Sequence, residues 1–151
     1  MKFSVRTLYG LKAVLVLAGR YGEGSLSVSQ IATKEGISVP YLEQILNALK
    51  KSGFVKSVRG PQGGYILAKK PAEIPAKAVI DALVEKKEPK TGAGASVTSE
   101  SGEATLASAI FWDRLNRSIR DGLADVTLKT LIDEARTLKK SKSRQTYTFH
   151  I

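Results

Sequence analysis

The chain has 151 residues, of which 42% are hydrophobic, enough to bury one core but little more than one domain. It contains no cysteine and one histidine, His150, which excludes disulfides, thiolate metal sites and cysteine nucleophiles. The formal net charge is +10, and the first 75 residues carry 11 basic and 4 acidic side chains, a balance of 11 − 4 = +7, so the N-terminal half favours a polyanionic partner.

Nothing in the sequence indicates a membrane or secreted protein. It holds no stretch of 18 or more apolar residues, and residues 1–6 do not lead into a signal peptide with a small-residue cleavage site. We therefore expect a cytoplasmic protein that has no membrane partner.

Two helices are predicted before Ile37. Residues 4–21 carry apolar side chains at helical spacing and are followed by glycines. The second helix begins at Ser27, whose hydroxyl can cap it while Gln30, three residues later, reaches back in a capping box. Gly36 is expected to end this helix, because glycine readily adopts the conformation that closes a helix C-terminus.

A third helix is predicted directly after Ile37, with Ser38 as its cap and Pro40 tolerated in its first turn. Its apolar residues follow an i, i+3, i+4, i+7 stripe, so the other face must look outward. The stripe consists of Leu42, Ile45, Leu46 and Leu49. Two helices joined by so short a turn are typical of a helix-turn-helix.

A β-hairpin, or wing, is predicted next. Residues 54–59 and 65–68 are strand-like, and the glycine-rich residues 60–64 between them form a turn. A further helix is predicted over residues 74–86. The sequence therefore predicts a mainly α fold with a small β-hairpin, in which residues 1–86 form a winged helix-turn-helix domain.

The rest of the chain is predicted to be a flexible loop, two helices and a tail. Residues 87–104 have the polar, glycine-rich composition of a loop. Residues 105–140 hold a long apolar helix that runs to about Gly122 and a last helix capped by Thr127, and we expect them to mediate dimerisation. The residues assigned to the dimer interface are Leu106, Ile110, Phe111, Trp112, Leu115 and Ile119. Residues 141–151 form a basic and aromatic tail.

The third helix is the candidate DNA reader, because a helix fits the major groove and its N-terminal residues approach base edges and phosphates. Gln44 or Asn47 suits bidentate contacts to adenine, and Glu43 can accept from cytosine N4. The residues assigned to this contact are Ser38, Val39, Pro40, Tyr41, Glu43, Gln44, Asn47 and Lys51. For this helix alone, an ordinary solvated face is an equally good interpretation.

The wing favours the DNA-binding interpretation. Arg59 is the candidate for the adjacent minor groove, and Gly60 and Gly63 allow the backbone to approach the sugar-phosphate chain. Lys50 and Lys56 are placed to neutralise flanking phosphates. A plain structural turn is the competing interpretation of the wing.

Five segments carry a family resemblance. Residues 38–46 (SVPYLEQIL), 53–55 (GFV) and 57–65 (SVRGPQGGY), with residues 112–115 and 126–131, resemble the Rrf2 family of bacterial regulators, which includes the IscR, NsrR and CymR types. The resemblance implies a winged-helix domain and a long helix that crosses to a second subunit. The implied homodimer binds a two-fold symmetric double-stranded DNA operator and usually represses. By position, the resemblance assigns the major groove to Ser38, Tyr41, Glu43 and Gln44 and the minor groove to Arg59.

The chain departs from the family pattern in two places. Pro40 stands where a small polar or flexible residue is common in the family, which alters the expected base preference. Cluster-binding members carry three cysteines before the long helix, where this chain has residues 92–96 (GAGAS) and no thiolate. Because iron–sulfur ligation needs soft thiolates, we expect no cluster, no metal and no other cofactor.

Residues 147–151 (YTFHI) resemble the aromatic C-terminal end of the CymR type, which regulates cysteine and sulfur metabolism. In that type the signal comes through a complex with cysteine synthase. The resemblance therefore leaves open a regulatory protein partner such as cysteine synthase.

We therefore expect a sequence-specific DNA-binding transcription regulator, a homodimeric repressor without an iron–sulfur cluster. The alternative is a protein-interaction adaptor that kept the winged fold and docks another protein. An enzyme is disfavoured because the sequence offers no nucleophile–base pair, and residues 60–64 lack the strand-to-helix context and the Lys-Ser/Thr ending of a phosphate-binding loop.

Overall fold

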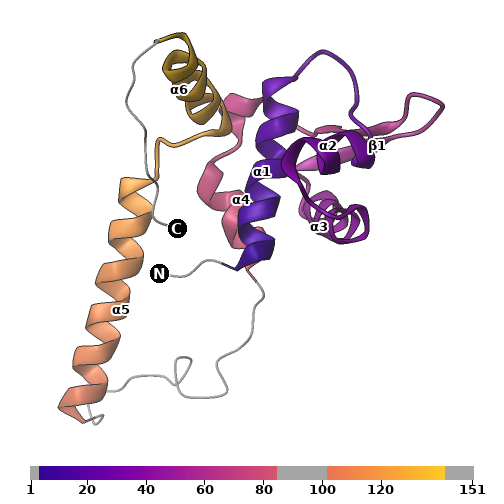
Figure 1. The fold of residues 1–151 in the computed structure, drawn as a ribbon. Helices are drawn as coiled ribbons and strands as arrows, with labels where there is room; N and C mark the ends of the chain where they lie inside the picture. Colours follow the sequence, from indigo (N-terminus) through magenta and orange to yellow (C-terminus); the bar gives the residue numbers. More distant parts are fainter. Residues whose placement is uncertain (1–3, 85–101, 142–151) are drawn as a thin grey trace. The chain divides into compact units, whose positions relative to one another are not determined.

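The computed structural model describes residues 4–84 and 102–141. The chain divides into two compact units, Met1–Val84 with Val126–Ile151 and Glu85–Asp125, and each is described by itself. The first unit contains α1 (Val5–Gly19), α2 (Val28–Glu35), α3 (Val39–Lys51), β1 (Val55–Val58), β2 (Gly64–Leu67), the 3-10 helix η1 (Pro71–Glu73), α4 (Ala76–Leu83) and α6 (Leu128–Lys140) (Figure 1). The second unit contains α5 (Glu103–Gly122). The predicted mainly α fold with a small hairpin is confirmed.

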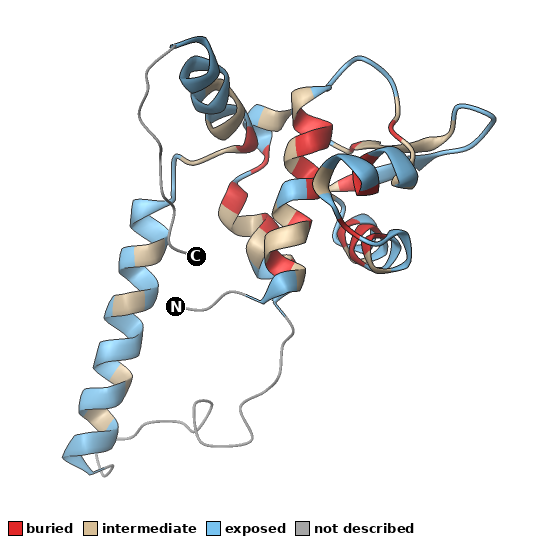
Figure 2. Cartoon of the chain, in the orientation of Figure 1, coloured by how far each residue is buried: buried red, intermediate tan, exposed pale blue. Residues whose placement is uncertain are grey.

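The core of the first unit is built around α1, which packs against α3, α4 and α6. The four residues of the predicted stripe on α3 are all fully buried, and Figure 2 shows the buried positions of α1 and α4 gathered around the same interior. Burial of each such leucine or isoleucine side chain stabilises the fold by about 1.5–3 kcal/mol. Gly10 lets α1 approach α4 closely, because a Cβ there would overlap Leu83. The amphipathic pattern of α3 thus fixes which of its faces remains outside.

The ends of α2 follow the sequence prediction. Ser27 Oγ accepts from the Gln30 backbone N–H at 3.2 Å, and Gln30 Oε1 accepts from the Ser27 N–H at 2.9 Å, which completes the capping box. Gly36 closes the helix in the left-handed conformation, with φ of 66°. Ser38 occupies the N-cap position of α3 as predicted, although its side chain makes no capping hydrogen bond.

The wing is an antiparallel hairpin in which Val55 pairs with Leu67 and Val58 with Gly64. A third segment joins it, because Leu26 and Tyr65 exchange backbone hydrogen bonds of 3.1 and 2.8 Å. Figure 1 shows the hairpin tip extending away from α1 beyond α2. The stem of the wing is thus fastened to the segment that leads into α2.

The helix predicted over residues 74–86 is shorter than expected. Pro75 has the extended backbone of a cap residue, with φ of −64° and ψ of 131°, so α4 begins only at Ala76. Helix α4 ends at Leu83, and Val84 returns to extended backbone. The short helix η1, which the sequence did not predict, begins at Pro71. Two prolines therefore divide this region into separate turns, since proline cannot donate to a preceding helical carbonyl.

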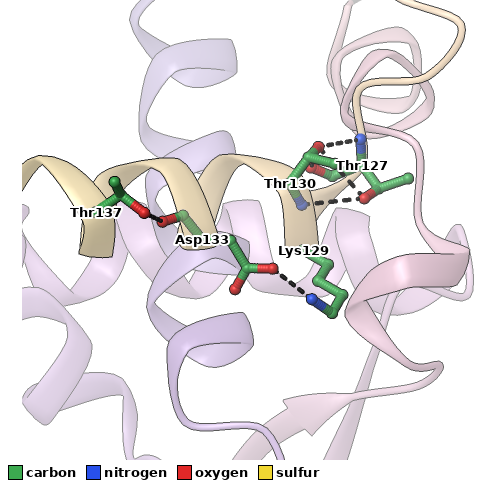
Figure 3. A network of polar contacts seen from close by, with 5 residues as sticks. All are labelled: Thr127, Lys129, Thr130, Asp133 and Thr137. Atoms are coloured by element: carbon green, nitrogen blue, oxygen red, sulfur yellow. Dashed lines mark hydrogen bonds and ion pairs between the residues drawn. The ribbon is translucent and has the colours of Figure 1, made fainter.

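Helix α6 starts as predicted at a cap formed by Thr127, which is drawn in Figure 3. Thr127 Oγ1 accepts from the Thr130 N–H at 3.2 Å, and Thr130 Oγ1 accepts from the Thr127 N–H at 2.8 Å. Further along the helix, Lys129 pairs with Asp133 (Figure 3). Leu128 is fully buried in the core of the first unit, and α6 packs against α1 and η1. The sequence grouped this helix with α5, whereas the structure makes it part of the winged-helix unit.

Helix α5 begins at Glu103, so residues 103–104 are helical although the sequence assigned them to the loop. Gly102 is the N-cap of α5, and the loop positions 87–101 and the tail positions after Ser141 lie outside the described residues. Among the helices described, none is long and apolar enough to cross a membrane.

Candidate nucleic-acid interface

The outward face of α3 carries the residues that the sequence assigned to DNA. Seven of the eight are exposed, because burial of the apolar stripe turns the remaining positions toward solvent. These seven are Ser38, Val39, Pro40, Glu43, Gln44, Asn47 and Lys51. They run along one helix and present amide, carboxylate, hydroxyl and ammonium groups, which can match the donor and acceptor pattern of a major groove.

Tyr41 differs from its neighbours. It is only half-exposed, and its ring lies edge-on to Tyr9 of α1 with centroids 6.1 Å apart and an interplanar angle of 74°. Edge-to-face aromatic pairs of this kind contribute about 0.5–1.5 kcal/mol beyond the area they bury. The sequence placed Tyr41 wholly on the outer face, and the structure corrects this by packing part of its ring on α1.

The wing tip presents Arg59, Gly60, Pro61 and Gln62 to solvent. Among the described residues, no carboxylate pairs with the Arg59 guanidinium. The side chain is therefore available to a phosphate or to a narrow minor groove, whose negative potential attracts arginine.

The backbone of the wing itself requires glycine at positions 60, 63 and 64. Gly60 has φ of +116°, which side chains disfavour, and its carbonyl accepts from the Gly63 N–H at 2.9 Å to close the turn. A Cβ on Gly63 would lie 2.6 Å from the Val58 carbonyl oxygen, and one on Gly64 would overlap the Leu26 carbonyl. These glycines would be needed without any ligand, so a DNA contact by Gly60 or Gly63 depends on their place at the tip and not on their being glycine.

Two hydrogen bonds connect the wing to the helix-turn-helix. Lys50 Nζ at the end of α3 donates to Ser57 Oγ of β1 at 2.8 Å. Ser25 Oγ, just before α2, donates to the Gln62 carbonyl oxygen at 2.6 Å. From sequence, Lys50 is expected against phosphate and no role is predicted for Ser25, because each bond joins elements whose proximity is set by the fold. The exposed residues of α3 and the wing tip 59–63, connected in this way, are called the reading surface below.

The charge of this region is mostly positive. Lys50, Lys51, Lys56 and Arg59 are all exposed, and Glu43 is the one acidic residue on the exposed face of α3. Neutralising phosphates with such side chains releases condensed counterions, which supplies affinity for any duplex. The surface thus combines general attraction to DNA with groups that can discriminate bases.

The side chains of this chain include few of the groups that bind transition metals or iron–sulfur clusters. The chain has no cysteine, and its single histidine, His150, lies outside the described residues. Within the described residues, no group of three or more His, Cys, Asp or Glu side chains is placed to hold a metal ion. The donor set of this chain therefore does not fit an iron–sulfur cluster ligated in the usual way.

Helix α5 presents apolar side chains on two faces. Phe111, Trp112, Leu115 and Ile119 recur at helical spacing and share one face, on which Phe111 and Trp112 form an edge-to-face pair with centroids 5.3 Å apart. Leu106 and Ile110 lie on another face, alongside the ion pair of Asp113 with Arg117. The hydrogen bond from Arg117 to Asp113 raises the pKa of that guanidinium. Ile110, Phe111 and Trp112 are each more than half exposed.

Known proteins match this chain over most of its length. The family model Rrf2, described as an iron-dependent transcriptional regulator, matches residues 3–134. The transcriptional regulator IscR of Pectobacterium atrosepticum is 33% identical over 148 residues, which cover 98% of this chain and 89% of that protein.

Solved structures agree with this match. The structure of IscR from T. potens has a TM-score of 0.73 at 35% identity and covers 97% of this chain and 95% of that one. The structure of CymR, titled the global cysteine regulator of B. subtilis, has a TM-score of 0.71 at 32% identity and covers 89% of this chain and 98% of that one. With its helix-turn-helix, its wing and these matches, the chain belongs to the Rrf2 family of winged-helix DNA-binding transcription regulators.

Proposed function

We propose that this protein is a homodimeric repressor that reads a two-fold symmetric operator with α3 in the major groove and Arg59 in the adjacent minor groove. The observation that carries the proposal is the reading surface itself. The hydrogen bond from Lys50 to Ser57 joins the exposed face of α3 to the hairpin that bears Arg59. A reading helix and a wing fastened in this way can contact neighbouring grooves of one duplex as a unit.

The side chains of α3 suit distinct contacts. Gln44 and Asn47 can each form two hydrogen bonds with adenine, and Glu43 can accept from cytosine N4. Val39 and Pro40 offer apolar contact to a thymine methyl, while Ser38, Tyr41 and Lys51 suit phosphate oxygens. At the wing, Gly60 and Gly63 would bring the backbone close to the sugar-phosphate chain beside Arg59.

Dimerisation through α5 completes the proposal. The apolar face of Phe111, Trp112, Leu115 and Ile119 is wide enough for a second copy of the helix to cover, as expected for a symmetric dimer. In this assignment residues 1–86 bind DNA and residues 105–140 contain the dimerisation helices, although α6 also packs on the winged-helix unit. A symmetric pair of reading surfaces then selects a symmetric operator.

Control of this repressor must use a signal other than cluster assembly, since the chain supplies no thiolate. Cysteine or sulfur metabolism is one candidate pathway. Its support is the structural similarity to a protein titled as a global cysteine regulator, together with the aromatic residues 147–151. In that case a regulatory protein such as cysteine synthase would be a partner to test by co-purification.

Selection of bound sequences from a pool of random duplexes tests the proposal. The expected result is enrichment of two related half-sites in inverted orientation, separated by about one helical turn or a multiple of it. A protein-interaction adaptor would enrich no recurrent sequence, and that outcome would exclude the repressor. A single asymmetric site would exclude the symmetric dimer on DNA.

A further inference from the structure

A solvent-open recess of about 410 Å³ lies where α1, the last residues of α2 and α6 meet in the first unit. Its lining, as far as the described part of the chain shows, includes no residue of α3 or of the wing. The recess is therefore separate from the reading surface. It lies against α2, the first helix of the helix-turn-helix.

The floor of the recess is apolar. Leu15 and Val16 of α1 contribute to it from one side, and Ile132 and Ala135 of α6 from the other. Val16 is buried, while Leu15 and Ile132 are half-buried and pack against the core. A hydrocarbon or aromatic group lying on this floor would lose contact with water, which favours binding in proportion to the area covered.

The rim of the recess is strongly basic. Five cationic side chains and one carboxylate line it, a balance of 5 − 1 = +4. The cationic residues are Lys12, Arg20, Lys34, Arg136 and Lys139, and the carboxylate belongs to Glu35. Such a concentration of one sign in a hollowed surface attracts anions.

The partners of these side chains leave much of the positive charge uncompensated. Glu35 pairs with Lys12 at 3.7 Å, and Arg20 pairs with Glu23 at 3.1 Å. Arg136 donates one N–H to the Gly19 carbonyl oxygen at 2.9 Å, which fixes its position but leaves its charge unpaired. Neither Lys34 nor Lys139 has a carboxylate partner among the described residues.

We propose that this recess binds a small organic anion, in which a carboxylate or phosphate group meets Lys34, Arg136 and Lys139 while an apolar part lies on Leu15 and Ile132. Its volume of about 410 Å³ falls in the range of about 300–1,000 Å³ that small-molecule sites occupy. The inference goes beyond the proposed function, because it holds whether or not the protein represses. The site would give a cysteine-free regulator a direct contact between a metabolite and α2.

Calorimetric titration of the whole chain without DNA tests the site with three probes. Phenyl phosphate carries both features, inorganic phosphate has the charge alone, and phenol has the ring alone. Phenyl phosphate is expected to bind at least about tenfold more tightly than either of the others, a difference of about 1.4 kcal/mol. Equal affinity for phenyl phosphate and inorganic phosphate would show that the apolar floor does not contribute to binding and would overturn the proposed site.

Variants then locate the binding. The double substitution Lys34→Glu and Lys139→Glu should weaken phenyl phosphate at least about tenfold, whereas Lys140→Glu, an exposed neighbour outside the recess, should leave it within about twofold. Lys34→Gln with Lys139→Gln repeats the test without reversing charge, and circular dichroism checks that each variant folds.

Three results would overturn the proposal. The first is that phenyl phosphate fails to bind at millimolar concentration. The second is that Lys140→Glu weakens phenyl phosphate binding as much as the double variant does. The third is that the double variant lowers affinity for a random duplex as strongly as Arg59→Ala, which would make the recess a contact for the DNA backbone. Because the titrations contain no DNA, their outcome is independent of whether the protein represses.

Discussion

Replacing Gly64 with alanine should loosen the stem of the wing. A Cβ at this position would overlap the carbonyl of Leu26 and lie 2.8 Å from the backbone nitrogen of Ser27. Both neighbours are backbone, so neither can rotate away as a flexible side chain would. β2 and the segment at Leu26 must therefore move apart, which weakens the hydrogen bonds of 3.1 and 2.8 Å between Leu26 and Tyr65.

The magnitude follows from these contacts. Two hydrogen bonds at about 0.5–1.5 kcal/mol each contribute about 1–3 kcal/mol. Steric strain from an added methyl group costs about 1–3 kcal/mol. The free energy of unfolding should therefore fall by about 2–6 kcal/mol in Gly64→Ala.

Urea unfolding followed by circular dichroism measures this change. Gly19→Ala is the matched control, because its Cβ would meet only Ile132 Cδ1 at an ordinary 3.8 Å, so no backbone has to move. If the free energy of unfolding of Gly64→Ala lies within about 0.5 kcal/mol of the unsubstituted chain, the wing and Leu26 do not pack as closely as described.

Three further experiments test the core, the helix caps and the proposed dimer interface. Leu46→Ala removes a fully buried side chain of α3 and should lower the free energy of unfolding by about 2–5 kcal/mol in urea, so a loss below about 1 kcal/mol would contradict its place in the core. Ser27→Ala should cost about 1 kcal/mol and Ser38→Ala clearly less, since only Ser27 makes a capping bond; equal losses would contradict this difference. If the proposed dimer forms through α5, Trp112→Glu with Ile119→Glu should yield monomer in sedimentation velocity while Arg114→Ala does not, and a dimer that persists in the double variant would exclude α5 as the interface.

Local patterns predicted the helix-turn-helix well. The capping box at Ser27, the left-handed Gly36 and the apolar stripe of α3 depend on residues within a few positions of one another. Hydrogen-bonding groups and helical spacing determine such features directly. The exposed face of α3 followed from the stripe without further information.

Contacts between distant segments were not predictable in the same way. The bonds from Ser25 to Gln62 and from Arg136 to Gly19 join positions 37 and 117 residues apart. No periodicity marks such pairs, because they arise only once the core has brought the elements together. The packing of Tyr41 on Tyr9 has the same origin, and because of it Tyr41, one of the residues assigned to DNA contact, lies partly against the core.

Boundaries near proline were the other source of error. Pro71 and Pro75 are visible in the sequence, yet the apolar residues that follow suggested one continuous helix over 74–86. In the structure Pro75 is the N-cap, so the helix starts at Ala76, and it ends at Leu83. The position of α6 against α1 and η1 also depends on buried Leu128, whose role its sequence neighbours do not reveal.

In the proposed function, α3 and Arg59 together read one DNA sequence. The most direct measurement is an equilibrium titration of the selected operator and of a random duplex, at one fixed salt concentration, with the parent chain, Gln44→Ala, Arg59→Ala and the control Arg114→Ala. Each of the two reading variants should lose about 1–3 kcal/mol on the operator and much less on the random duplex, while the control keeps the parent's preference. Unchanged operator affinity in both Gln44→Ala and Arg59→Ala would show that α3 and Arg59 do not read the operator.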